Sequence, residues 1–254
     1  MRLLLVEDHD MLARAVAREL ADVYGHDVSW VPSPAAMRQL LVRESFDVVV
    51  VDLLYDQLVR DFEPRRKSGS IDLTTDEFLV TGLTALHWLR QVSPRPGVVV
   101  WSSGEANRRL HLLFAYEDLK VRVFCSKSSG SGRVDTLQEA ITAAAVGRNW
   151  VDHVLNCYLP ARLARPLAGT LLQKEAHRRI WRAISAGAHS KSEIVSLTHY
   201  AESVVRKCIP RMYDELVELD EGMTKRGVSI SELAAFGAAN WQFFLDDAVR
   251  LRYP

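Results

Sequence analysis

The sequence has few cysteines and no long uncharged hydrophobic run. Its 254 residues include three cysteines, at positions 125, 157 and 208, without a C-x-x-C pair. This excludes a disulfide framework and gives no zinc signature. After four apolar residues the amino end reaches Glu7 and Asp8, and no 18-residue uncharged stretch follows, so we expect neither a secretory signal nor a membrane span. We therefore expect a soluble cytoplasmic protein with no membrane partner.

An overall excess of charge is also lacking. The 32 basic and 32 acidic side chains cancel, which excludes a uniformly basic binder of polymers. Their distribution is uneven, because residues 161–213 hold 10 basic and 3 acidic side chains while the stretches before and after are net acidic. This segment is where we expect a polyanionic partner, although solvated helix faces carry similar charges.

The length suits two domains, and no internal repeat or low-complexity tract is evident. Short apolar runs alternate with amphipathic segments over residues 1–147. The strand-like runs are Leu3–Val6, Val28–Val31, Val48–Val51, Val98–Trp101 and Val121–Cys125, and the helix-like segments are Met11–Tyr24, Pro34–Ser45, Leu83–Val92 and Val134–Val146. This alternation predicts an α/β domain with a doubly wound, five-stranded parallel sheet. Residues 148–170 are typical of a linker, and residues 171–254 predict a smaller all-α domain.

Acidic residues follow two of the predicted strands. Glu7 and Asp8 end the first strand and Asp52 ends the third. Ligands bind at the carboxyl ends of such strands, and clustered carboxylates repel unless a cation joins them. The oxygen donors favour Mg²⁺, which would also make Asp52 a usable nucleophile toward a phosphoryl group.

Two further groups are expected at the same edge of the sheet. Ser102 follows the fourth strand and Lys127 the fifth, so a hydroxyl and an ammonium could hold two phosphoryl oxygens. Taken one at a time, these residues have ordinary explanations: an aspartate in a turn, an acidic pair capping a helix, a solvated lysine. Only their common position favours a site.

This set resembles the receiver domain of two-component response regulators, which has a flavodoxin-like fold. The matching segments are LLLVEDHD, VVVVDLL, VVVWSS and VFCSK. The resemblance implies that Asp52 accepts a phosphoryl group from a histidine kinase, with Mg²⁺ bound by Glu7, Asp8 and Asp52. It further implies that Ser102 and Lys127 contact the phosphoryl group and that Phe124 is the switch aromatic. Ser128 stands where the family usually has proline, and the Met-Pro pair that often follows the acceptor is absent.

An insertion is the largest departure from the receiver pattern. The family's glycine normally lies about eight residues beyond the acceptor, a short βα connection. Here the matching Gly82 comes thirty positions after Asp52, so that about 22 extra residues fall within residues 55–80. We expect this loop to be either a lid or partner-binding element beside Asp52, or a surface insertion that loop entropy tolerates.

The basic stretch predicts two short helices joined by a turn. Ser190 is placed to cap the first helix, and the run Tyr200–Leu216 is similar to the recognition helix of LuxR/NarL-type helix-turn-helix domains, with Pro210 inside it as a departure. Such a domain implies binding of double-stranded DNA as a dimer. Expected phosphate contacts are Arg178, Arg179, Arg182, Lys191, Arg206, Lys207 and Arg211, and the best candidates for base reading are Glu202, Ser203, Arg206 and Lys207.

Together these features predict a response regulator that is phosphorylated on Asp52 and controls transcription, not an enzyme. The alternatives are a signalling adaptor whose helices bind a protein, and a degenerate receiver that acts without phosphorylation. A phosphohydrolase using the same aspartate is a weaker option. The amphipathic segment Ser229–Leu251 could supply dimer contacts or, as we favour, pack on its own domain.

Overall fold

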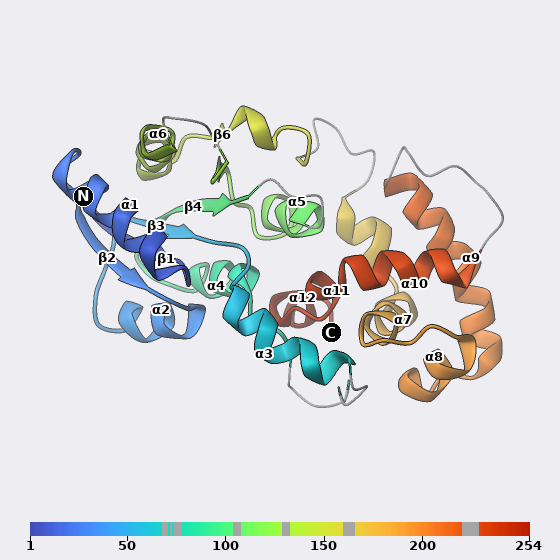
Figure 1. Cartoon of the computed structure of the whole chain (residues 1–254). Coiled ribbons are helices and arrows are strands. Elements are labelled where there is room, and N and C mark those ends of the chain that lie inside the picture. Colours follow the sequence, from blue (N-terminus) through green and yellow to red (C-terminus); the bar gives the residue numbers. More distant parts are fainter. Residues whose placement is uncertain are drawn as a thin grey trace. The chain divides into compact units, whose positions relative to one another are not determined.

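The chain folds into two compact units (Figure 1). The computed structural model describes residues 1–67, 71, 73, 78–103, 108–128, 133–159, 166–219 and 229–254. One unit, here called the sheet unit, comprises Met1–Leu58 and Val80–Ala161. The other, the helical unit, comprises Val59–Leu79 and Arg162–Pro254. Parts of the predicted inserted loop and linker lie outside the described residues.

A parallel sheet forms the centre of the sheet unit. Its strands are β1 (Arg2–Val6), β2 (Asp27–Val31), β3 (Val48–Val51), β4 (Gly97–Ser102), β5 (Val123–Ser126) and β6 (Trp150–Val151). All pairs are parallel, in the order β2-β1-β3-β4-β5-β6. The α/β class and the five predicted strands are confirmed. Strand β6 lies within the predicted linker and was not predicted, because two residues are too few to show a period in the sequence.

Helices cover both faces of this sheet. They are α1 (Asp10–Asp22), α2 (Pro34–Leu41), α4 (Gly82–Leu89), α5 (Arg109–Glu117) and α6 (Arg133–Ala145), with a 3₁₀ turn at His153–Leu155. Helix α1 contacts α6, whereas α2 contacts α4 and α4 contacts α5. All four valines of β3 are buried, as expected of a strand covered on both faces. Helix α5 was not predicted, because its residues Leu110–Ala115 are all buried and show no polar face.

The helical unit is built around α7 (Glu175–Ser185). The other helices are α8 (Lys191–Thr198), α9 (Glu202–Leu219), α10 (Ile230–Ala239), α11 (Trp241–Phe244) and α12 (Asp247–Arg252), with a π-helical turn at Ala168–Leu172. Trp181 of α7 is fully buried and stacks on Phe244 at 4.8 Å between ring centroids. The carboxyl-terminal segment therefore packs against α7 of its own unit, the alternative favoured from the sequence.

The inserted segment contains a helix, α3 (Asp56–Lys67). Its first residues belong to the sheet unit, and residues from Val59 onward belong to the helical unit. A loop beside Asp52 was expected here, and no sequence pattern indicated that the segment is divided between the two units.

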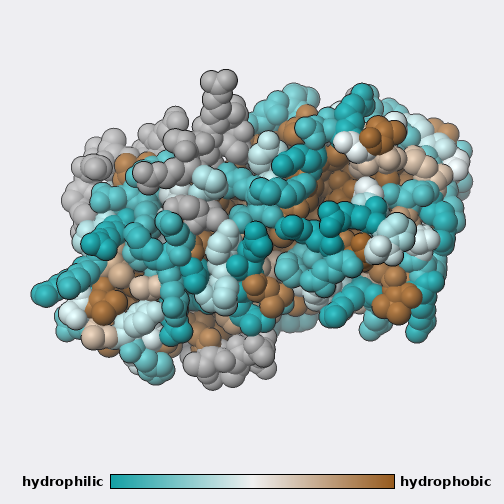
Figure 2. All heavy atoms as spheres, turned by 180° about the vertical axis from the view of Figure 1, so that it is seen from behind, coloured by the Kyte–Doolittle hydropathy of each residue, from teal (hydrophilic) through white to brown (hydrophobic). Residues whose placement is uncertain are grey.

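No helix within the described part of the chain is long and apolar enough to cross a membrane. Hydrophilic residues cover most of the face shown in Figure 2, with hydrophobic residues gathered in smaller patches between them.

Candidate functional site

Three carboxylates meet at the carboxyl edge of the sheet. Strands β1 and β3 pair in parallel with Val6 opposite Val51, so the residues that follow them lie side by side. One ligand oxygen from each of Glu7, Asp8 and Asp52 lies within 4.8 Å of the others. Glu7 is 1% exposed and Asp52 is 3% exposed. The sequence prediction that these acids converge agrees with this geometry.

Burial makes this cluster costly in its ionised form. It raises the pKa of Asp52 above its ordinary value, against the effect of Lys127, and it raises that of Glu7, where Asp52 adds repulsion. Lys127 Nζ lies 2.7 Å from Asp52 Oδ2 and also pairs with Glu7. The lysine is positioned by its backbone N–H, which donates to Ser102 O at 3.0 Å. The Lys127 ammonium balances only one of the three carboxylate charges.

Tyr55 provides a separate indication of a missing partner. Its side chain is 1% exposed, and its hydroxyl forms no hydrogen bond with any described residue. Burial, and after it the neighbouring carboxylates, raise the pKa of the phenol well above its ordinary value. Buried hydroxyls are normally satisfied. Clustered oxygen donors with an unpartnered hydroxyl beside them fit a hard divalent cation such as Mg²⁺, which Glu7, Asp8 and Asp52 would hold.

Arg108 is a site residue that the sequence did not reveal. Its Nη1 lies 3.7 Å from Asp52 Oδ1 and donates to Ser102 Oγ at 3.3 Å. The guanidinium therefore stands between the expected acceptor and the expected phosphoryl-binding hydroxyl, and its side chain is 13% exposed. The sequence showed no sign of helix α5, which begins directly after Arg108. Without that helix, no pattern indicated that Arg108 lies at the carboxyl edge of the sheet.

The remaining predicted receiver residues are buried near this edge. Ser102 ends β4 and is fully buried. Phe124 lies within β5, also fully buried, and its ring is 6.2 Å from that of Tyr116 on α5. Ser102, Lys127 and the three acids thus come together, while Phe124 lies two residues before the end of its strand.

Gly82 closes the insertion at Asp52. Its N–H donates to Leu53 O at 2.9 Å, and a Cβ at this position would lie 2.0 Å from Asp52 O. Only glycine allows this approach of α4 to the acceptor strand. At the start of the insertion, Gln57 N–H donates to Asp8 Oδ2 at 3.2 Å. Both ends of the inserted segment therefore contact the acid cluster or its loop.

Helices α8 and α9 form the second candidate site. Ser190 and Glu193 form a reciprocal capping box at the start of α8. His199 ends α8 in the left-handed region with φ of 56°, and α9 then runs without interruption through Pro210. The predicted DNA-contacting side chains Lys191, Glu202, Ser203, Arg206, Lys207 and Arg211 are all exposed.

Two of the arginines expected to contact phosphates have internal partners instead. Arg178 donates to Pro254 O and Leu172 O, and Arg182 donates to Tyr253 O at 2.6 Å. Burial lowers the pKa of Arg182 to about 10. These two guanidinium groups tie the carboxyl terminus to α7. Glu215 binds His177 Nδ1 at 2.7 Å and Lys174 Nζ at 3.1 Å, which anchors α9 to α7.

Comparisons with known proteins place this fold in a class. No model of a known family matches the sequence, and no curated protein matches it either. Solved structures of response regulators do match. The chain has their two-part fold of a receiver-like sheet unit followed by a helical unit, at identities so low that the likeness concerns the fold alone.

Several of the matching structures are structures of RcsB. The structure of RcsB from Salmonella enterica serovar Typhimurium, bound to a promoter in the presence of the phosphomimetic BeF₃⁻, matches with a TM-score of 0.56 and 14% identity, over 92% of this chain and 97% of that one. A two-component response regulator RcsB–DNA complex matches with a TM-score of 0.54 and 13% identity, over 92% and 98%. A structure of two RcsB dimers on two parallel DNAs matches with a TM-score of 0.53 and 14% identity, over the same shares.

Proposed function

We propose that this protein is a response regulator of a two-component system, phosphorylated on Asp52 by a histidine kinase and controlling transcription through DNA. The observation that carries the proposal is the convergence of Glu7, Asp8 and Asp52 with Lys127 and Ser102 at one edge of the sheet. Bound Mg²⁺ would neutralise an incoming phosphoryl group. Of the chain's own residues, Asp52 supplies the nucleophilic oxygen, Lys127 and Ser102 hold phosphoryl oxygens, and Phe124 responds to the change.

The DNA-binding part of the proposal rests on α8 and α9. Exposed Arg206, Lys207 and Arg211 share one helix, in a chain stretch with a net charge of +7. Basic side chains on a recognition helix supply phosphate contacts first and base contacts second. One such module binds weakly, so a homodimer on two half-sites follows.

The test of phosphorylation is a mass measurement. The full chain incubated with phosphoramidate and Mg²⁺ gains one phosphoryl group, and Asp52→Asn gains none. Omission of Mg²⁺ abolishes the gain. An unmodified wild type under these conditions would instead support a degenerate receiver.

The test of DNA binding is retention of the full chain on randomised duplex DNA at low salt. Arg206→Ala and Lys207→Ala weaken retention, whereas Arg14→Ala, an exposed change on α1, leaves it unchanged. Absence of retention in the wild type, with and without phosphodonor, would favour the adaptor instead.

A further inference from the structure

The amino-terminal arm of the inserted segment packs into the helical unit. Phe62 of α3 is 8% exposed and stacks on Trp241 of α11, with ring centroids 5.8 Å apart and planes 11° apart. The Arg66 guanidinium lies over the same indole at 5.0 Å, and Arg66 Nε donates to Ser185 O of α7 at 2.7 Å. Apolar stacking, a cation–π contact and a hydrogen bond thus fix α3 to two helices.

The returning arm is held in the same unit by backbone hydrogen bonds. Leu79 is 2% exposed and forms a parallel bridge with Asp246, between α11 and α12. Its N–H donates to Leu245 O at 2.8 Å, and its carbonyl accepts from Asp247 N–H at 2.9 Å. The ring of Phe78 has the guanidinium groups of Arg182 and Arg250 over it, at 5.6 and 5.2 Å.

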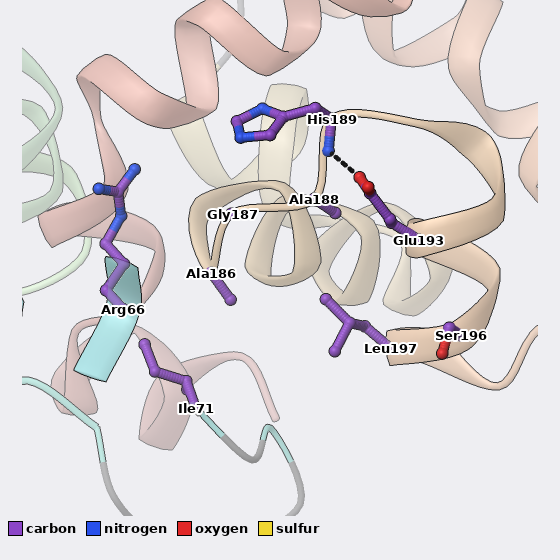
Figure 3. Close-up of a pocket in the computed structure, with 9 residues that line it drawn as sticks. All are labelled: Arg66, Ile71, Ala186, Gly187, Ala188, His189, Glu193, Ser196 and Leu197. Atoms are coloured by element: carbon purple, nitrogen blue, oxygen red, sulfur yellow. Dashed lines mark hydrogen bonds between the residues drawn. The ribbon is translucent and has the colours of Figure 1, made fainter. Parts of the chain in front are cut away.

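The segment also reaches the entrance to the helix-turn-helix. Figure 3 shows Arg66 and Ile71 facing the turn that joins α7 to α8. They line a cavity of about 430 Å³ together with residues 186–189 of this turn and three residues of α8. His189 N–H at this turn donates to Glu193 Oε2 at 2.7 Å, as part of the cap that begins α8. A shift of α3 would therefore act on the turn that orients α8.

Outside the helical unit, the same segment is attached at the acid cluster. Gln57 N–H donates to Asp8 Oδ2 and Gly82 N–H to Leu53 O, so each end lies within a few residues of Asp52. Helix α3 is continuous from Asp56 to Lys67 and connects the first of these anchors to the Phe62–Trp241 stack. A helix transmits a displacement of one end to the other because its hydrogen bonds keep its length fixed.

From these contacts we propose that the inserted segment is the element that connects the acceptor site to the helix-turn-helix, and that its partner is the chain's own helical unit. This role differs from the lid over Asp52 and from the tolerated surface insertion that the sequence left open. The proposal rests on the function proposed above, because it needs an event at Asp52 to transmit. Occupation of the phosphoryl site changes the path of residues 53–57 and 82, and α3 carries the change to α11 and to the α7–α8 turn. Packed elements that have two discrete arrangements amplify a small local shift in this way.

The experiment compares the DNA affinity of the full chain with and without Mg²⁺ and BeF₃⁻. In the wild type, BeF₃⁻ changes the Kd by about fivefold or more, within the usual range of coupling between sites. In Phe62→Ala and in the milder Arg66→Gln the change falls below about twofold. Arg60→Ala, an exposed change on the same helix, keeps the full response and serves as the matched control.

Hydrogen–deuterium exchange in the same samples separates the possible failures. BeF₃⁻ binding protects peptides covering residues 50–58 in every variant, and it alters exchange over residues 241–252 in the wild type and Arg60→Ala alone. Full response of the DNA affinity in Phe62→Ala and Arg66→Gln would overturn the proposed connection while leaving the proposed function intact. Lack of protection at residues 50–58 in the wild type, or of DNA binding, would overturn the function and with it the connection.

Discussion

At the scale of single residues, Asp52 is a buried acid with two cations beside it. Lys127 and Arg108 approach different oxygens of its carboxylate, at 2.7 and 3.7 Å. Water is largely excluded here, so charge interactions are stronger than at the surface. An incoming phosphoryl group would find Lys127, Arg108 and the Ser102 hydroxyl already in place.

Arg108→Ala is expected to slow the phosphorylation of Asp52 by about tenfold, because loss of a hydrogen bond between charged groups costs about 1.5 kcal/mol. Arg108→Lys retains the positive charge without the planar guanidinium, and its phosphorylation rate is expected to lie between those of Arg108→Ala and the wild type. The rate is measured by mass spectrometry with phosphoramidate. Arg95→Ala, an exposed change, is the control. Equal rates for Arg108→Ala and the wild type would remove Arg108 from the site.

His111 gives the protein a pH-dependent stability. It is fully buried in α5, and burial, together with the charge of Arg108, lowers its pKa to about 3. The unfolded chain therefore takes up a proton near pH 6.5 that the folded chain refuses, so stability is complete above that pH and falls as the pH drops toward 3. The slope from this group is about 1.4 kcal/mol per pH unit.

The check is urea unfolding of the wild type and His111→Gln between about pH 7 and pH 4. The glutamine variant loses less stability over this range, because it has no proton to take up on unfolding. Both chains share every other titrating group, so their difference isolates His111. Parallel curves would show that another group causes the acid sensitivity.

At the scale of elements, the strands of the sheet were predictable because buried parallel strands are continuous apolar runs. The acid cluster followed from them, since parallel strands bring Glu7 and Asp52 to one edge. Helix α5 was missed because burial on all sides removed its periodicity, and Arg108 was missed with it. Helix α3 was missed because it carries many charged residues and its apolar contacts, Phe62 against Trp241, are distant in sequence.

Gly82→Ala is expected to destabilise the sheet unit by about 2 kcal/mol or more, because the new methyl group meets the backbone of Asp52 and Leu53. Gly25→Ala is the comparison. It adds a methyl group with no atom within 4 Å and incurs only the strain of a φ of +66°, a cost of about 1 kcal/mol. Denaturant unfolding of both variants measures the difference, and a smaller loss for Gly82→Ala than for Gly25→Ala would contradict the close approach.

Ser190→Ala removes the side chain that caps α8. The loss is expected to be about 1 kcal/mol, since Ser190 Oγ accepts from Glu193 N–H and no other side chain replaces it in the capping box. Chemical denaturation of the full chain, followed by helical circular dichroism, provides the measurement. Ser196→Ala, an exposed change within the same helix and away from the cap, is the control, and equal losses would rule out the capping contribution.

At the scale of the whole molecule, a net charge of zero conceals a division of roles among the basic residues. Arg178 and Arg182 bind carbonyls of the carboxyl terminus, whereas Arg206, Lys207 and Arg211 are exposed on α9. The second group, with its exposed side chains, is the better placed of the two to meet phosphates. Removal of one cation that binds a phosphate should reduce the slope of log K against log salt by about 0.9.

Lys207→Ala is therefore expected to weaken binding to all duplex sequences alike. It should also lower the steepness of that slope by about 0.9, the contribution of one phosphate contact. Titrations at three salt concentrations measure it. Arg14→Ala, whose side chain is exposed on α1, leaves the slope unchanged. A Lys207→Ala slope equal to that of the wild type would show that the lysine does not bind the DNA backbone.

The path of the chain has a consequence for its modularity. It leaves the sheet unit after Leu58, returns at Val80 and leaves again after Ala161, so that one unit takes part of its core from a stretch enclosed by the other. Two-domain proteins whose halves are joined by a single linker can exchange those halves by gene fusion. Here a chimera that joins residues from about 150 onward to another protein's amino-terminal domain would lack Phe62 and Leu79. The reverse chimera would carry these two residues without the helices that they pack against. A single cut between the two halves therefore cannot separate this protein into two complete units.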